Sequence, residues 1–284
     1  MRRFAKAIKL QHLFIFVAVI LCVLGLVRLA GPSVHAAAQN PVPYPGALHN
    51  HPFAKAWSPT DLYNWGPGSN APGNCTNPNT SEITNHGSYV ELSTTGATGD
   101  CVDLESPHEY PTSDGYVYEA KINVSNWTQW LSFWMYGSNW PVGGEIDAIE
   151  GGSGRNYVSY HYEGTNGPTS VSNCNDTNGC DANAGPITQP SNSATLTNIA
   201  PGTHIIDISF GGCGSGCGAV GVWYDGKEVA LVSGSYVLDG GSSDDPYWIT
   251  FSTGSCNSAS NGDVCGSQGQ TSGNIQIDYL RAFT

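Results

Sequence analysis

Three carboxylates lie close together in a chain in which only 12% of the residues are charged. In the segment "WPVGGEIDAIEGG", Glu145, Asp147 and Glu150 are separated by apolar residues, and the nearest Lys or Arg before them is Lys121. Crowded acids without a neighbouring cation push one another's pKa values apart, so that one stays protonated while another is ionised. This pattern is typical of a site that combines a general acid with a carboxylate nucleophile.

The spacing of the three acids decides which side of a strand they occupy. Residues two apart on a strand share a face, so Glu145 and Asp147 project together, whereas Glu150 would face away. One β-bulge between Asp147 and Glu150 adds a residue without a partner and returns Glu150 to the common face. Two Glu side chains on one face can then approach the separation of about 5–5.5 Å that a retaining glycosidase requires. Two interpretations without catalysis stay open, namely exposed surface acids and ligands for Ca²⁺.

A Trp-rich segment, "WTQWLSFWMYGSNWP", immediately precedes the acids. A single Trp is by default a core residue, but its ring can equally form an apolar platform that excludes water from a binding site. We expect Trp134 and Trp140 to border a carbohydrate cleft. Trp223 and Trp248 are interpreted as either core residues or further platforms.

Alternation of apolar and polar residues recurs along the chain and predicts many short β-strands. Asp225-Gly226 is a two-residue hairpin signal, and no sustained helical stripe is found. In the last strand the alternation places five side chains on one expected face: Ile275, Ile277, Tyr279, Arg281 and Phe283. Short strands with long polar loops favour an all-β sandwich of the jelly-roll type. The predicted strands are 116–124, 157–162, 204–210, 220–232, 247–251 and 275–283.

The first 36 residues are predicted to be a secretory signal peptide. Four basic residues precede the apolar run Leu13–Val27, which is shorter than the roughly 20 residues of a membrane span, and small residues follow it. Cleavage after Ala36 or Ala38 would release a secreted, extracellular protein that is not membrane-bound, and retention as an anchor is the alternative. Residues 37–56 are expected to be irregular, and residues 57–284 to form one catalytic domain.

The net charge limits the partners of the mature chain. Residues 1–36 hold five of the ten Lys and Arg residues and none of the 23 acids, so five basic and 23 acidic residues remain, a formal charge of −18. Such a surface repels phosphate backbones, and nucleic-acid binding is not expected. A polysaccharide partner fits, since most polysaccharides are uncharged. One domain without a separate binding module predicts a monomer.

Cysteine usage agrees with export. Cys22 lies in the signal segment, which leaves an even number of cysteines for disulfide bonds outside the cytoplasm. A zinc site is disfavoured, because "CGSGC" lacks the C-x-x-C spacing and no His pair follows. Proximity in sequence suggests the pairs Cys75–Cys101, Cys174–Cys180, Cys213–Cys217 and Cys256–Cys265.

The segment "LSFWMYGSNWPVGGEIDAIEGG" resembles the active-site segment of glycoside hydrolase family 16, the laminarinase and lichenase group. The family signature E-[ILV]-D-x-x-E is matched from Glu145 to Glu150, and the preceding W-P-x-x-G element from Trp140 to Gly144. The resemblance implies a concanavalin A-like β-jelly roll with a carbohydrate cleft on its concave sheet, and hydrolysis with retained configuration. It makes Glu145 the nucleophile, Asp147 its assistant and Glu150 the acid/base.

Further expectations follow from the same resemblance. No cofactor is needed for catalysis, although family members often bind a structural Ca²⁺, for which the Asp-rich loops at 100–109 and 239–245 are candidates. His161 follows the catalytic strand where the family usually has a His, and it could contact substrate. Arg155, the first cation after the acids, is a further candidate for binding sugar hydroxyls. The chain departs from the family where laminarinases carry "WPAFW" and "NLAVGG", which puts β-1,3-glucan specificity in question.

Three functions are therefore consistent with the sequence. The first is a secreted endo-acting hydrolase of internal β-1,3- or mixed β-1,3/1,4-glucan bonds. The second keeps the same residues but passes the sugar to another sugar, as a transglycosylase acting on cell-wall glucan. The third is a non-catalytic, glycan-binding jelly roll. Three crowded acids argue against the third function, because a pure binding module does not need them.

Overall fold

A computed structural model describes most of the chain after residue 52, and statements about the fold concern those residues. All of them belong to one compact unit, Pro41–Thr284. Residues 1–36, predicted to be a signal peptide, lie outside the described part, within which no helix is long and apolar enough to cross a membrane. The described residues are 53–66, 80–94, 101–112, 115–125, 130–137, 144–151, 157–162, 180–183, 200–214, 217–234, 237, 246–254 and 273–284.

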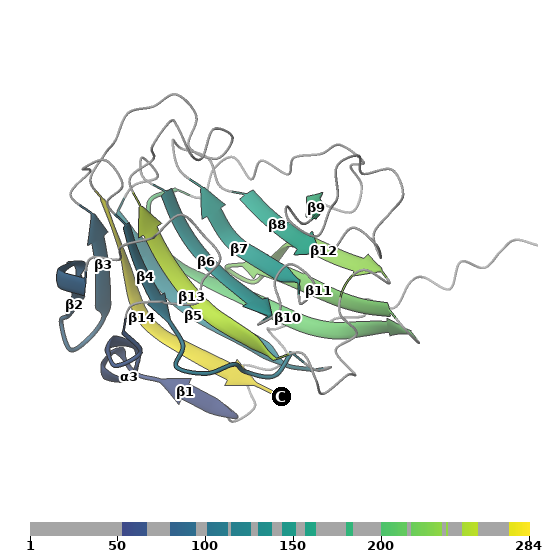
Figure 1. Cartoon of the computed structure of the whole chain (residues 1–284), viewed down its shortest axis with the longest axis horizontal. Coiled ribbons are helices and arrows are strands. Elements are labelled where there is room, and N and C mark those ends of the chain that lie inside the picture. The colour runs from purple at the N-terminus through teal and green to yellow at the C-terminus, as the bar shows by residue number, and fades with distance from the viewer. Residues whose placement is uncertain are drawn as a thin grey trace, which may run out of the picture. The chain divides into compact units, whose positions relative to one another are not determined.

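The larger sheet has eight antiparallel strands in the order β12-β11-β10-β5-β14-β3-β2, with β1 paired to β14 (Figure 1). Two of its strands, β5 and β10, correspond to the segments in which alternation was strongest. Its strands are β1 (Lys55–Trp57), β2 (Ile83–Asn85), β3 (Val90–Thr94), β5 (Val117–Val124), β10 (Gly202–Gly214), β11 (Cys217–Tyr224), β12 (Lys227–Gly234) and β14 (Gly273–Phe283).

The smaller sheet has six antiparallel strands in the order β4-β13-β6-β7-β8-β9, and its inner face packs on the larger sheet. The Trp-rich segment supplies β6, and the acid segment supplies β7 beside it. Its strands are β4 (Cys101–Glu105), β6 (Trp130–Gly137), β7 (Glu145–Gly151), β8 (Tyr157–Tyr162), β9 (Cys180–Asn183) and β13 (Tyr247–Gly254). Two stacked antiparallel sheets confirm the prediction of an all-β sandwich.

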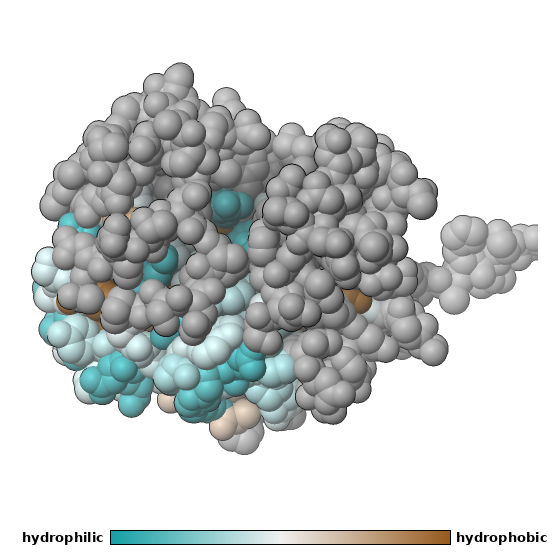
Figure 2. Space-filling view, in the orientation of Figure 1, coloured by the Kyte–Doolittle hydropathy of each residue, from teal (hydrophilic) through white to brown (hydrophobic). Residues whose placement is uncertain are grey.

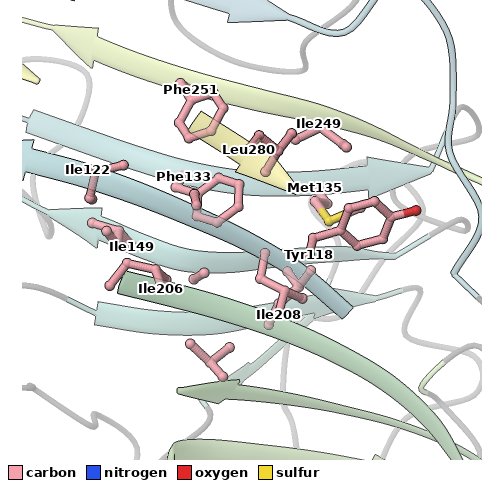
Figure 3. Close-up of a cluster of buried hydrophobic side chains, with 14 of the residues drawn as sticks. Tyr118, Ile122, Phe133, Met135, Ile149, Ile206, Ile208, Ile249, Phe251 and Leu280 are labelled. Atoms are coloured by element: carbon pink, nitrogen blue, oxygen red, sulfur yellow. The ribbon is translucent and has the colours of Figure 1, made fainter. Parts of the chain in front are cut away.

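The core lies between the sheets and is built from the apolar half of each alternating strand. Side chains of both sheets meet there, and the rings of Phe133 and Phe251 stack with centroids 4.7 Å apart (Figure 3). Because every second residue points inward, the other half of each strand is free to carry polar groups. The described surface in Figure 2 is accordingly hydrophilic for the most part. Among the described residues, the exposed large apolar side chains are Phe53 and Tyr63.

The predicted hairpin between β11 and β12 is confirmed. Asp225 and Gly226 have φ values of 51° and 77°, the left-handed conformations that a two-residue turn of type I′ requires. The Asp225 carboxylate also accepts hydrogen bonds from the Ile205 backbone N–H and from the His204 ring, both at 2.9 Å. The turn is thereby tied to the neighbouring strand β10.

The expected alternation of the last strand is wrong in its second half. A β-bulge at Asp278 shifts the register of β14 against β5 between Ile277 and Tyr279. Ile275 and Ile277 point into the core as expected, but Leu280 and Ala282 follow them instead of Tyr279 and Arg281. Arg281 lies on the outer face, 3.5 Å from Glu119 and over the Tyr279 ring. One extra residue in the strand therefore exchanges the two faces.

Among the described residues, two short helical elements interrupt the strands, namely α3 (Pro59–Tyr63) and the 3₁₀ helix η1 (Thr80–Glu82). Ser58 caps α3 and forms a capping box with Asp61, in which each side chain binds the other residue's backbone N–H. This helix was not expected, because five residues are too few for a periodic stripe. Strand β1 begins at Lys55, so regular structure starts two residues before the expected boundary at 57.

One observation bears on the predicted disulfide bonds. Cys101, the first residue of β4, is disulfide-bonded. Cys213 and Cys217 lie where β10 and β11 meet, and Gly214 pairs with Cys217. Four of the expected partners lie outside the described residues, namely Cys75, Cys174, Cys256 and Cys265. The four pairings therefore remain predictions.

Candidate active site

Strand β7 carries the three acids on one face, as the parity argument predicted. Against β6, Glu145 pairs with Tyr136, Asp147 with Trp134, and Glu150 with Ser132. The register shifts by one residue between Asp147 and Glu150 on both sides of the strand, which confirms the bulge. The three acids therefore share the face of the six-stranded sheet that points away from the core, here called the acid face. Asp147 is only 3% exposed, while Glu145 and Glu150 are half-buried.

The bulge is held from the opposite sheet. Ala148 is the residue without a partner in β6, and its carbonyl oxygen accepts a hydrogen bond from the hydroxyl of Tyr224 on β11. Ile146 and Ile149 on either side of it are completely buried in the core. A bulge frees a backbone polar group from the ladder, and a buried group of that kind needs another partner. Tyr224 provides that partner for Ala148.

Gly144, which precedes the first acid, cannot carry a side chain without displacing its neighbours. Its φ is +73°, and a Cβ there would collide with the hydroxyl groups of Tyr160 and Tyr247. Its carbonyl accepts the backbone N–H of Gly137 at 3.0 Å, which closes the β6–β7 connection. The entry of β7, and with it the position of Glu145, is thus set by tight packing around a glycine.

Trp134 forms a fixed aromatic surface beside the acids. It pairs with Asp147 in the β6–β7 ladder and is 5% exposed. Its indole N–H donates to the Ser252 hydroxyl at 3.0 Å, and its ring stacks on that of Tyr136 at 5.0 Å. Both contacts fix the orientation of the ring next to Asp147, and the expectation that Trp134 borders a carbohydrate cleft remains a prediction.

Two more acids lie on the same face, in the segment 100–109 that was expected to be an Asp-rich loop and instead contains strand β4. In the β4–β13–β6 ladders, Glu105 aligns with Thr250 and then Trp134, and Asp103 aligns with Ser252. The Tyr136 hydroxyl donates to Glu105 at 2.7 Å. Burial raises the pKa of Asp103 to about 6, and the charge of Glu105 adds to this against the opposing effect of a hydrogen bond with Ser252. The alternation of apolar and acidic residues in "CVDLE" is the sequence signal that could have predicted a shared face for Asp103 and Glu105.

The other aromatic and polar candidates separate into three groups. Trp248 pairs with Tyr136, so it lies on the acid face, where it is half-buried. Trp223 lies on the outer face of the other sheet, buried with Ala219 and Leu231, and is no platform for this site. The backbone of His161 pairs with Glu145, but its side chain is outside the described set, as are Trp140 and Arg155 altogether.

In the described part of the chain, no group of three or more His, Cys, Asp or Glu side chains could hold a metal ion. The Asp-rich loop at 239–245 lies entirely outside the described residues, so a structural Ca²⁺ at that loop remains a prediction. What the acid face presents is a row of carboxylates beside a stacked indole and phenol, which suits proton transfer and nucleophilic attack on an uncharged substrate.

Comparison with known proteins gives a match to one family model. Residues 74–222 match a family model described as an XgeA-like, catalytic GH16 domain. A probable endo-1,3(4)-beta-glucanase of Aspergillus flavus is 33% identical over an alignment of 136 residues, and the match covers 42% of this chain and 20% of that protein. The matched region thus spans about a fifth of the length of this curated relative.

Two solved structures share the sandwich. LamAcat from Zobellia galactanivorans is 13% identical with a TM-score of 0.51, covering 84% of this chain and 99% of that one. A structure described with endo-acting O-glycanases of the human gut microbiota is 18% identical with a TM-score of 0.53, covering 82% and 99%. At these identities the likeness concerns the fold, and it supports the prediction of a β-sandwich of the jelly-roll kind.

Proposed function

This chain belongs to glycoside hydrolase family 16 and is a glycosidase by that membership, and we propose that it cleaves internal β-1,3- or mixed β-1,3/1,4-glucan bonds with retention of configuration. The observation that carries this proposal is the bulge at Ala148, which aligns Glu145, Asp147 and Glu150 on the acid face. Without that bulge, Glu150 would point into the core and only one Glu of this strand could reach a substrate.

In the first step, the ionised Glu145 carboxylate attacks the anomeric carbon of the sugar. A bond forms between a Glu145 oxygen and that carbon while the glycosidic carbon–oxygen bond breaks. Glu150 gives its proton to the departing oxygen, so that the leaving sugar departs as a neutral alcohol. The product of this step is a covalent glycosyl–enzyme ester with inverted configuration.

In the second step, Glu150 works in the opposite direction. Its carboxylate takes a proton from a water molecule, whose oxygen attacks the anomeric carbon and displaces Glu145. Two inversions give net retention. Asp147 stands between the two Glu residues and is almost completely buried. There it shares a proton with Glu145 and holds the orientation of that carboxylate.

Three further parts of the proposal rest on different support. The β-glucan substrate is supported by the resemblance to the Aspergillus flavus protein. The stacked ring of Trp134 is the surface on which a sugar ring would lie. Secretion to the extracellular space is supported by the signal-like residues 1–36 and by the disulfide bond of Cys101.

The test is a substrate panel with the full chain exported through an oxidising compartment. Release of reducing ends is measured from laminarin, mixed-linkage β-glucan, agarose, carrageenan and xyloglucan, with Glu145→Gln as the matched control. We expect cleavage of laminarin or mixed-linkage glucan and none by the variant. Cleavage of neither glucan by the folded protein would refute the proposed substrate. Elongated products at high acceptor concentration would point to transglycosylation instead.

A further inference from the structure

Of the acids whose side chains the structure describes, five share the acid face. Strand β4 repeats the arrangement of the catalytic strand three strands away. Glu105 lies in the same cross-strand row as Asp147, and Asp103 in the same row as Glu150. With strands about 4.8 Å apart, the two acid groups are about 14 Å from each other along these rows. The side chains of β13 and β6, including Trp134, form the floor between them.

The Lys and Arg residues that the structure describes all lie away from these acids. Only five Lys and Arg residues follow residue 36, and the structure describes four of them. On the outer face of the other sheet, Lys121 binds Asp278 at 2.6 Å and Arg281 lies 3.5 Å from Glu119. The remaining two are Lys55, which lies over the rings of Trp57 and Tyr110, and Lys227, which is exposed beside the β11–β12 turn. None of these four side chains lies on the acid face, and Arg155 and the side chain of His161 lie outside the described set.

The charges on β4 reach the reaction centre through Tyr136. Its hydroxyl donates to Glu105, and its backbone pairs with Glu145. Burial raises the pKa of this hydroxyl, the hydrogen bond to Glu105 raises it further, and the charges of Glu105, Asp103 and Glu145 all add to the effect. One phenol is therefore close enough to the β4 acids and to the proposed nucleophile to respond to each of them. A charge on a bound sugar between them would respond likewise.

The floor between the acid groups also holds two hydroxyl groups. Thr250 lies opposite Trp134 in the ladder between β13 and β6, and Ser132 lies two residues from Trp134 along β6. Both residues are at most 1% exposed. Among the described residues neither hydroxyl oxygen has a hydrogen-bond partner. Carboxylates accept hydrogen bonds only, while hydroxyl groups both donate and accept. A sugar hydroxyl can satisfy both kinds of group, whereas a sulfate or carboxylate can only repel the acids.

We propose that Asp103 and Glu105 form a second carboxylate pair of the glycan-binding face, which takes uncharged sugar units and rejects polymers that carry sulfate or uronate groups. This inference rests on the proposed function and narrows its substrate class. In this proposal, β4 selects between uncharged and charged sugar units that lie away from the bond being cleaved. The catalytic strand does not contact those units and cannot select among them alone.

The test compares one polymer with its charged derivative. The uncharged polymer that the panel shows to be cleaved is paired with its own carboxymethylated form, and kcat/KM is measured for both at low and high salt. The variant is Asp103→Asn with Glu105→Gln. Its matched control is Asp278→Asn with Glu228→Gln, which removes the same two charges from the other sheet. Comparing the two polymers within each protein cancels any general loss of activity or folding.

We expect the wild type to prefer the uncharged polymer by about tenfold at low salt, with the preference shrinking as salt screens the acids. The β4 variant should lose most of this preference, and the control should keep it. A wild-type preference near one, or one that does not change with salt, would overturn the proposal, as would an unchanged preference in a folded β4 variant. Cleavage of carrageenan in preference to both glucans would overturn it as well. Failure to cleave any polymer would instead refute the proposed function.

Discussion

Replacing Tyr224 by Phe removes one oxygen atom and with it the hydrogen bond that holds the catalytic bulge. The ring stays in the core, where Tyr224 is 6% exposed, so packing is kept. The carbonyl of Ala148 loses the donor that reaches it across the core. Leaving a buried polar group in this state costs about 1–3 kcal/mol. The strand can lower that cost by flattening the bulge, which turns Glu150 away from the acid face.

The expected result is a loss in kcat with little change in KM. A displacement of the acid/base by about 1 Å can cost up to about a hundredfold in rate, so we predict that kcat falls between tenfold and a hundredfold. KM should stay within about twofold, because Trp134 and the other binding groups are untouched. The assay is steady-state cleavage of the polymer identified by the panel, together with urea unfolding to measure the free energy of unfolding.

Tyr118→Phe is the matched control. Tyr118 is also a buried residue of the eight-stranded sheet, and its hydroxyl donates to a backbone carbonyl, that of Pro111, at 2.5 Å. Because Pro111 is exposed, water can replace the lost donor there, so this variant should lose about 0.5–1.5 kcal/mol of stability and keep its kcat. Equal kcat values for the two variants would show that the Tyr224 contact contributes stability alone, and that the bulge does not depend on it.

Three further predictions concern other parts of the domain. Asp207 is 1% exposed, and burial first, then the charges of Glu119 and Asp225, raise its pKa to about 8. The stability that its protonated form gives is lost as the pH rises toward 8, so Asp207→Asn should raise the free energy of unfolding by about 2 kcal/mol or more at pH 9 and hardly change it near pH 4, measured by urea unfolding. Gly144→Ala should lower stability by about 2 kcal/mol and also lower kcat, because the new Cβ strains the entry of β7; unchanged kinetics would contradict this. Because the pKa of Asp103 is about 6, the preference for uncharged polymers should weaken below that pH, and a preference that is constant from pH 5 to 8 would exclude Asp103 from it.

Local signals in the sequence predicted the parts of the fold that local geometry determines. The two-residue turn at Asp225-Gly226 needs only its own residues, and the bulge in β7 follows from the parity of three acids that must share a face. The bulge in β14 was missed because both halves of its alternation contain apolar residues. Which half faces the core is decided by pairing with β5, more than 150 positions away in the chain.

In the candidate site, the position of the β4 acids also depends on strand pairing that the local sequence does not reveal. Their alternation with Val102 and Leu104 predicts that they share a face, but not that the face is that of Glu145. That relation depends on the partners of β13, which pairs with β4 on one side and β6 on the other. The contact between Tyr224 and Ala148 crosses from one sheet to the other and leaves no pattern in either segment.

The most direct test of the account is the configuration of the products that azide forms with two variants. Without the Glu145 carboxylate, in Glu145→Ala, azide can attack the anomeric carbon in its place and give the glycosyl azide of inverted configuration. In Glu150→Ala, azide attacks the glycosyl–enzyme ester and gives the retained configuration. The substrate is an activated glycoside of the oligosaccharide that the panel identifies, and the anomers are distinguished by ¹H NMR. Inverted azide from the first variant and retained azide from the second is the predicted result. The reverse assignment, or the same anomer from both, would contradict the roles given to Glu145 and Glu150.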